Sequence, residues 1–284
     1  MKYIILTITI ILLYSCGSSS RVRDIYKYSS ATFGSVKSYT TKPVYKGEKE
    51  STIYATAEIG NGENTQNRNE SEDLKTHSSL RIHRSITDKN YNLHYGLGAS
   101  FGKYEFSNTL NDYIKNTIEK SYYTIDAKTG FNYNISKKTI DYRLFGLEFG
   151  YHYEGGEYHK FIDTMPIGEF SENYIRITTN NPKSFFSFNI NTEIVFKMKG
   201  DKQISFGLFS GKTWITNKSK EDFKTNNIYR FGGLMGAISF KNVTFSLIGE
   251  AGHINNTNFH FRNTNFGMTY RIPNRIKKQI MKKN

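Results

Sequence analysis

Residues Tyr91–Tyr104 read YNLHYGLGASFGKY. Between positions 91 and 102 the odd-numbered residues are Tyr, Leu, Ala and Phe, and the even-numbered ones are Asn, His, Gly and Ser. This alternation predicts a β-strand with one apolar and one polar face, because successive side chains point to opposite sides of a strand. The stretch is longer than the roughly 5–6 residues usual in soluble strands. It is long enough to cross a bilayer, which takes about 9–11 tilted residues.

Similar segments recur along the chain. We predict strands at 52–60, 78–86, 91–104, 122–135, 140–153, 184–198, 204–215, 228–241, 243–252 and 259–272. The connections between them are alternately long and short, and membrane barrels combine short periplasmic turns with long external loops and an even strand number. The predicted fold is therefore all-β: a transmembrane antiparallel up-and-down β-barrel of ten strands, with both of its ends in the periplasm.

A soluble, lipocalin-like barrel is the main alternative, with the apolar faces turned inward. Volume argues against it, because eight strands already enclose an interior that side chains fill. The apolar faces of ten strands hold too many large side chains for such a space. Aromatic residues near the predicted strand ends also fit the girdles that membrane barrels place at the two interfaces. These residues are Tyr91, Tyr123, Tyr133 and Trp214.

The chain begins with an export signal. Lys2 precedes the apolar run Ile4–Leu13, which is too short to span a membrane as a helix. The run ends in Leu13-Tyr14-Ser15-Cys16 and resembles a bacterial lipoprotein signal, which implies cleavage before Cys16 and acylation of that residue, for example with palmitate. Cys16 is the only cysteine, so we expect no disulfide. An ordinary signal peptide with a chance cysteine is the alternative.

Composition narrows the class further. The net charge is +14, largely from the two ends of the chain, and an exported protein of this kind is not expected to bind nucleic acid. The mean hydropathy of −0.58 excludes a helical-bundle membrane protein but not a barrel, whose lumen and loops are polar.

We divide the chain into four parts. Residues 1–15 are the signal peptide, 16–50 the lipidated cysteine and a periplasmic linker, 51–272 the barrel, and 273–284 a basic tail. A plug or an extra edge strand is the alternative for the linker. The tail could form a short amphipathic helix on anionic headgroups or stay solvated.

Charged residues on the polar faces are expected to line the lumen. We assign the acids Asp126, Glu148, Glu193 and Glu250 and the bases Lys128, Lys197, Arg230 and Arg271 to it. Equal numbers favour a narrow, salt-bridged interior, because an unpaired buried charge is costly. The hairpin turn near residues 137–138 predicts Asp126 almost opposite Glu148, with Lys128 as the diagonal neighbour of Glu148. Arg230 is expected near the level of Glu250.

The chain also contains candidate residues for an enzymatic site. His152, Glu154 and His159, with Glu148, form the one group of acids and histidines near a predicted outer rim. Their spacing matches no zinc pattern, and histidines at a rim are common. We therefore expect no catalytic residues, metal or cofactor. Leu110, Tyr113, Ile114 and Ile118 have helical spacing, which predicts a short helix in the connection 105–121.

Together these features resemble small outer-membrane β-barrel proteins of Gram-negative bacteria, of the lipid-anchored kind common in Bacteroidota. The resemblance implies an outer-membrane location, with the lipid in the inner leaflet, and contact with barrel-assembly and lipoprotein-sorting machinery. It does not imply an activity. We expect a structural or surface-interaction role, with a surface ligand bound through loops 61–77, 105–121 and 154–183. A small porin, a lipocalin-like binder and an outer-membrane hydrolase are the alternatives.

Overall fold

The computed structural model describes residues 25–28, 30–32, 37–65, 72–106, 118–165, 168–170, 175–179, 182–215, 228–254 and 260–273. The predicted signal peptide, Cys16, most of the predicted tail and residues 107–117, where a loop helix was predicted, lie outside these ranges. Within them, no helix is both long and apolar enough to cross a membrane.

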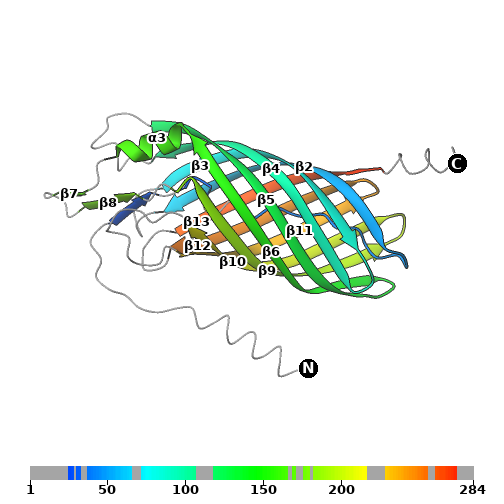
Figure 1. The fold of residues 1–284 in the computed structure, drawn as a ribbon. Coiled ribbons are helices and arrows are strands. Elements are labelled where there is room, and N and C mark those ends of the chain that lie inside the picture. The colour runs from blue at the N-terminus through cyan, green and yellow to red at the C-terminus, as the bar shows by residue number, and fades with distance from the viewer. Residues whose placement is uncertain are drawn as a thin grey trace, which may run out of the picture.

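Ten antiparallel strands close into a barrel (Figure 1). They are β2 (Glu50–Thr65), β3 (Glu72–Thr87), β4 (Tyr91–Phe106), β5 (Ile118–Ser136), β6 (Ile140–Gly156), β9 (Ser184–Met198), β10 (Lys202–Ile215), β11 (Ile228–Phe240), β12 (Val243–Ile254) and β13 (His260–Ile272). Each pairs with its neighbour in sequence, and β13 pairs with β2 to complete the ring. The predicted fold is confirmed, although the strands on the long-loop side run further than expected.

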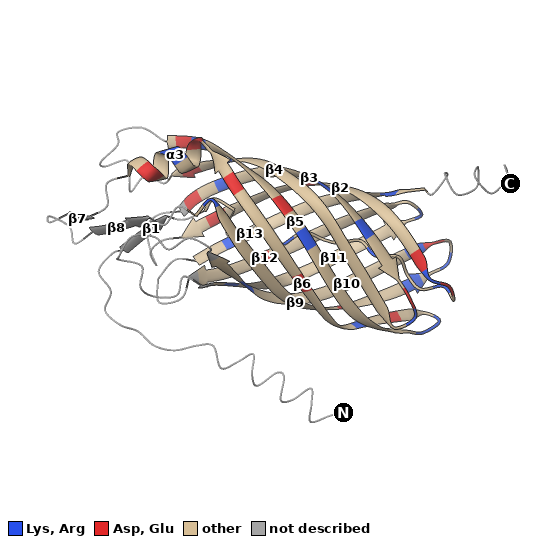
Figure 2. Cartoon of the chain, in the orientation of Figure 1, with Lys and Arg blue, Asp and Glu red and all other residues tan. Residues whose placement is uncertain are grey.

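The outer surface of the barrel is apolar, as the alternation predicted. In β4 the side chains of Leu97 and Phe101 are each 66% exposed, whereas Asn92 and His94 on the other face are buried in the lumen. Charged residues are sparse along the middle of the strands and more frequent toward the two ends (Figure 2). An exposed apolar belt bounded by charged ends is the surface that a bilayer requires. The lipocalin-like alternative, with its apolar faces inward, does not fit it.

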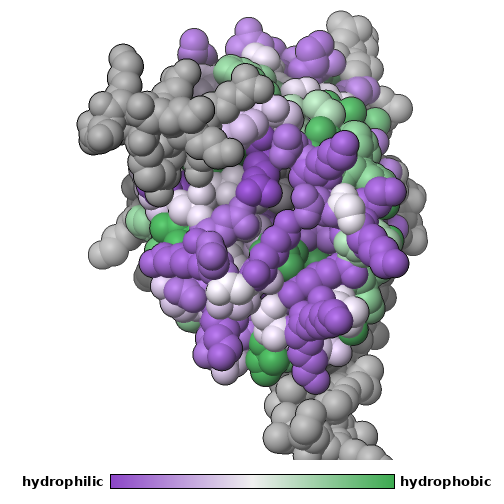
Figure 3. Space-filling view, turned by 90° about the vertical axis from the view of Figure 1, so that its right-hand side faces the viewer, coloured by the Kyte–Doolittle hydropathy of each residue, from purple (hydrophilic) through white to green (hydrophobic). Residues whose placement is uncertain are grey.

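Tight turns close one end of the barrel, which we call the short-turn end. Between β9 and β10 the turn contains Gly200 and Asp201 with φ values of 74° and 57°, the left-handed region that Gly and Asp tolerate best. A hairpin also joins β5 to β6, where the Lys137 amide donates to the Ile140 carbonyl. The surface at this end is mostly hydrophilic (Figure 3).

The opposite end, which we call the long-loop end, carries additional structure. The helix α3 (Glu157–Thr164) follows β6, and β7 (Gly168–Phe170) pairs with β8 (Ile175–Thr179). The N-terminal strand β1 (Ile25–Tyr28) runs parallel to β8. Tyr158 and Ile162 of α3 pack with aromatic side chains of β4 and β5 in one buried cluster, which closes this end of the barrel. The other members are Ala31, Tyr104, Phe106, Tyr122 and Met165.

Candidate functional site

Two described parts of the N-terminal segment, residues 30–32 and 37–46, lie inside the barrel. Ser30 and Thr32 contact Glu154 at the long-loop end, Lys37 and Tyr39 lie in the middle, and Lys46 reaches the short-turn end. Residues 37–39 and 41–43 are buried. A periplasmic linker was predicted for 16–50, with a plug as the alternative. The contacts of residues 30–32 and 37–46 contradict a linker over these parts and agree with a plug.

Glu148 on β6 is the acceptor for the middle of this segment. The Lys37 ammonium lies 3.2 Å from one carboxylate oxygen, and Nε2 of His94 lies 3.3 Å from the other. The Asn189 amide donates a further hydrogen bond of 3.0 Å. Lys37 also lies 5.6 Å from the centroid of the Phe209 ring on β10, two strands along the wall from β6. All of these charged and polar groups are nearly inaccessible to solvent, so each depends on its partners within the protein.

Glu193 on β9 anchors the next part of the segment. Arg143 donates to its Oε2 at 2.6 Å, and the Lys42 ammonium lies 3.6 Å from the same oxygen. The Tyr39 hydroxyl donates to Oε1 at 2.7 Å. The wall also bonds to the backbone of the segment, since Arg143 donates to the Lys42 carbonyl and the Thr87 hydroxyl to the Pro43 carbonyl. The segment is therefore held by both its side chains and its backbone.

The predicted cluster of Asp126, Lys128 and Glu148 is inward-facing and buried, but its pairing differs from the prediction. Asp126 accepts two hydrogen bonds from Arg81, at 2.8 and 3.1 Å. The Lys128 ammonium lies 3.4 Å from the Ser38 hydroxyl of the threaded segment. The residue opposite Asp126 is His152, not Glu148. The hairpin closes later than predicted, and a bulge at Tyr133/Asn134 shifts the register by one further residue.

The other predicted lumen charges lie in three different places. Glu193 and Glu250 are buried and face inward, whereas Arg230 is exposed on the outside of the barrel, so its assignment to the lumen was wrong. In β11 the inward-facing residues include Phe231 and Met235. Lys197 and Arg271 lie at the short-turn mouth, where Lys197 pairs with Asp141 at 2.6 Å and Arg271 with Glu50.

An apolar cluster fills the lumen on the side of β10–β13. Tyr39 of the threaded segment packs there with Phe209, Phe231 and Met235. The remaining members are Phe185, Tyr229, Ala237, Ile248 and Phe261. The enclosed space nearest to the charged side of the lumen, beside Ser38 and Asp126, has a volume of about 20 Å³, which is room for about one water molecule.

Glu154 is the centre of the acid and histidine group near the rim. It accepts hydrogen bonds from the Ala31 amide at 2.7 Å, from the Thr32 amide at 2.8 Å and from the Ser30 hydroxyl at 2.5 Å. The Thr32 hydroxyl is a further donor, and His159 Nε2 lies 2.9 Å away. Glu154 is fully buried, so its role in the structure is to bind the N-terminal segment to the barrel wall.

His152 belongs to a separate contact. Its Nε2 lies 2.9 Å from the Ser187 hydroxyl, and its ring stacks on Phe185. A Ser–His pair at this distance is the geometry of an activated nucleophile, but both residues are buried in the filled lumen. In the described ranges, no three acidic, histidine or cysteine side chains are placed to hold a metal ion.

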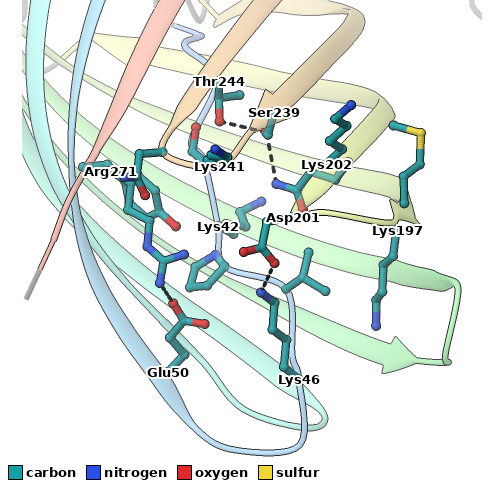
Figure 4. Close-up of a pocket in the computed structure, with 17 residues that line it drawn as sticks. Lys42, Lys46, Glu50, Lys197, Asp201, Lys202, Ser239, Lys241, Thr244 and Arg271 are labelled. Carbon is teal, nitrogen blue, oxygen red and sulfur yellow. Dashed lines mark hydrogen bonds and ion pairs between the residues drawn. The ribbon is translucent and has the colours of Figure 1, made fainter.

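A pocket of about 110 Å³ opens at the short-turn end (Figure 4). Lys46 pairs with Asp201 at 2.5 Å, and this contact lowers the pKa of the Asp201 carboxyl. Arg271 pairs with Glu50 across the mouth. The lining contains more cations than acids, the cations being Lys42, Lys46, Lys197, Lys202, Lys241 and Arg271.

Sequence reasoning missed the partners that hold the lumen charges. Arg81 and His94 lie on inward positions of β3 and β4, and alternation alone could have placed them there. The position of Arg81 was obscured because His83 and Arg84 follow it closely, and Arg84 faces outward. Lys37 and Lys42 carried no signal, since their segment has no regular pattern.

The closed ring of ten strands and its exposed apolar belt define an outer-membrane β-barrel protein. No family model and no curated protein matches the sequence. Among solved structures, the chain is similar to the transport unit of the autotransporter AIDA-I from Escherichia coli, with 7% identity and a TM-score of 0.37 over 80% of this chain and 93% of that one.

Two further solved structures are similar over comparable lengths. LpxR from Salmonella typhimurium is 10% identical with a TM-score of 0.37, and the match covers 78% of this chain and 99% of that one. An outer-membrane channel from Pseudomonas putida F1 is 9% identical with a TM-score of 0.40, and the match covers 82% and 98%.

Proposed function

We propose that this protein is a lipid-anchored outer-membrane barrel that its own N-terminal segment keeps closed, with a structural or surface-interaction role. The observation that carries the proposal is the position of residues 37–43 inside the lumen, where Lys37, Tyr39 and Lys42 bond to the wall. The aromatic cluster beneath α3 is a second barrier at the long-loop end. An open pore would instead need a continuous polar path lined by one excess sign of charge.

The position of the N-terminal segment also bears on the lipid anchor. β1 lies beside β8 at the long-loop end, so the chain enters the barrel from that side and leaves it at the short-turn end. Cys16 precedes Ile25 by nine residues, which span at most about 32 Å when fully extended. We therefore place the acyl chains of Cys16 in the leaflet beside the long loops, the outer one, rather than in the inner leaflet that the sequence suggested.

The surface role rests on the long-loop end. The predicted loop ranges 61–77, 105–121 and 154–183 include the strand ends at which β2 connects to β3, β4 to β5 and β6 to β9. All three connections are at this end, where α3 and the small sheet of β1, β7 and β8 give an ordered framework. Long external loops on a rigid barrel are the usual position for recognition in such proteins. The partners we propose are a surface ligand at these loops and outer-membrane lipid around the apolar belt.

Planar-bilayer recordings test the closed lumen. We expect no large, steady conductance from the wild-type protein. A variant in which residues 37–45 are replaced by a Gly/Ser sequence of equal length should conduct. Heat-modifiable migration on a gel verifies that both proteins fold, and Lys103→Ala, an exposed substitution on the outer wall, serves as the control. A large, steady wild-type conductance would contradict the proposal and favour the small-porin alternative.

The lipid anchor is tested separately. Labelled fatty acid should enter the wild-type protein and not Cys16→Ala. Intact cells expressing a protease site placed between Cys16 and Ile25 should release the label-bearing peptide when an external protease is added. Protection of that site in intact cells, with cleavage only after lysis, would place the anchor in the periplasm.

A further inference from the structure

A row of basic side chains crosses the outside of the barrel near the long-loop end. Lys212 of β10 is directly opposite Arg230 of β11, Arg230 is opposite His253 of β12, and His253 is opposite His260 of β13. Arg262 follows two positions later on the same outward face of β13. Lys212, Arg230, His260 and Arg262 are exposed, and His253 is partly exposed. We call these five residues the basic row.

Such a row is unfavourable when no anion is bound. Like charges directly opposite each other on neighbouring strands destabilise a sheet, and Lys212 and Arg230 are in that position. Within the described ranges, neither they nor Arg262 make an ion pair, although Glu63 of β2 lies across from Arg262. The sequences of the adjoining loops contain no excess of negative charge that would neutralise the row. Residues 216–227 contain three Lys and two acids, and residues 255–259 contain no acid.

The height of the basic row relative to the membrane indicates which anions could neutralise it. On the side toward the short-turn end, the same outward faces carry exposed apolar side chains, among them Leu208, Leu234 and Leu247. On the side toward the loops, Trp214 follows Lys212 by two positions and contacts Phe188. Aromatic girdles mark the boundary between the hydrocarbon core and the headgroups. Lys212 is two residues from Trp214, so the basic row lies at this boundary, where the long side chains of Lys and Arg reach the headgroups.

We propose that the basic row binds the phosphates of a glycolipid of the outer leaflet that carries two phosphate groups. The row extends over three strand spacings, roughly 15 Å, which is more than one phosphate can contact. Long loops face the exterior, so the headgroups at this level belong to the outer leaflet. A shallow hollow of about 390 Å³ beside Arg262 gives a bulky headgroup room. Its lining includes Asn61, Glu63, Leu74, Thr76 and Thr264.

The opposite wall provides the matched comparison. Lys103 is also an exposed cation on the outside of the barrel at the long-loop end, but its ammonium lies 2.7 Å from Glu119. A cation with its own carboxylate gains little from a phosphate, because the carboxylate already neutralises it. We therefore expect the lipid phosphates to bind at the basic row and not at Lys103.

Native mass spectrometry of the detergent-purified protein tests this inference. The probes are bisphosphorylated lipid A, monophosphoryl lipid A, phosphatidylglycerol and inorganic phosphate. Bisphosphorylated lipid A should bind the wild type best, and the triple variant Lys212→Ala/Arg230→Ala/Arg262→Ala should bind it at least tenfold more weakly, a difference of about 1.4 kcal/mol. Lys103→Ala should bind as the wild type does.

Three outcomes would overturn the inference. They are unchanged binding by the triple variant, equal losses in the triple variant and Lys103→Ala, and equal binding of phosphatidylglycerol and bisphosphorylated lipid A by the wild type. Heat-modifiable migration verifies that each variant folds. If the triple variant fails to fold, the single variants Arg230→Ala and Arg230→Lys decide the question, since only the first should weaken binding.

Discussion

Along β3, β5 and β6 the inner wall of the barrel is charged, whereas along β10 and β11 it is aromatic and aliphatic. The charged half includes Arg81, Asp126 and Glu148, and the threaded segment bonds to it through defined ion pairs. The apolar half includes Phe209, Phe231 and Met235, and the segment reaches it through Tyr39. The two halves hold the same segment through different kinds of interaction. Ion pairs need specific partners, whereas apolar packing needs mainly shape and volume.

The largest expected effect is in the charged half. Glu148→Gln keeps the shape of the side chain but leaves the buried Lys37 ammonium without its carboxylate, which should destabilise the protein by about 3–5 kcal/mol. Urea unfolding in lipid vesicles, followed by the fluorescence of the single tryptophan, measures this. Glu63→Gln on the outer wall is the control and should change little. Equal stability of wild type and Glu148→Gln would mean that this ion pair does not hold the segment.

Tyr39 connects the two halves, so its hydroxyl should have an intermediate effect. Tyr39→Phe retains the ring in the apolar cluster but removes the hydrogen bond to the Glu193 carboxylate. A hydrogen bond to a charged group contributes about 1.5–3 kcal/mol, which is the loss we expect in the same unfolding measurement. Tyr45→Phe, whose hydroxyl donates to a carbonyl at an exposed site, should lose far less. A similar loss in both variants would remove any special role of Tyr39.

The apolar half should tolerate a change of shape at constant volume. Met235→Leu should cost less than about 1.5 kcal/mol, because volume-conserving substitutions in apolar cores are usually accepted. The contrast with Glu148→Gln, which is just as conservative in shape, is what separates the two halves. A Met235→Leu loss as large as that of Glu148→Gln would show that both halves demand specific partners.

The smallest effect is expected outside both halves, at the Lys46–Asp201 pair of the short-turn mouth. Both side chains are more than half exposed, so Asp201→Asn should cost less than about 1 kcal/mol. The folded-state pKa of Asp201 is lowered, so this contribution is present above its ordinary pKa and disappears as the pH falls through the lowered value. Wild-type and Asp201→Asn stabilities should therefore converge in acid. A difference that grows in acid would contradict the pairing.

The two halves also explain which inward faces the sequence revealed. In β4 and β5 the lumen is polar and the outside is apolar, so alternation identified both faces correctly. In β11 both faces are apolar, with Phe231 and Met235 inside and Leu234 outside. The two faces of β11 therefore do not differ in polarity, and the sequence pattern does not show which one faces the lumen. Arg230 was assigned to the lumen because it is charged, and this assignment is wrong. The same lack of contrast in β11 concealed the outward position of Arg230 in the basic row.

The sequence by itself determined the architecture: ten strands, their order, the membrane-facing belt and the alternation of short turns and long loops. These features can be recognised from short stretches of sequence, because a bilayer requires apolar side chains on the lipid-facing side of each strand and a pairing partner for every strand. The tertiary structure alone decided the contents of the lumen. Lys37 and Glu148 are 111 residues apart in sequence, and Arg81 and Asp126 are 45 apart. No local pattern encodes such a pairing, because strand register, bulges and the course of the N-terminal segment determine which charges meet.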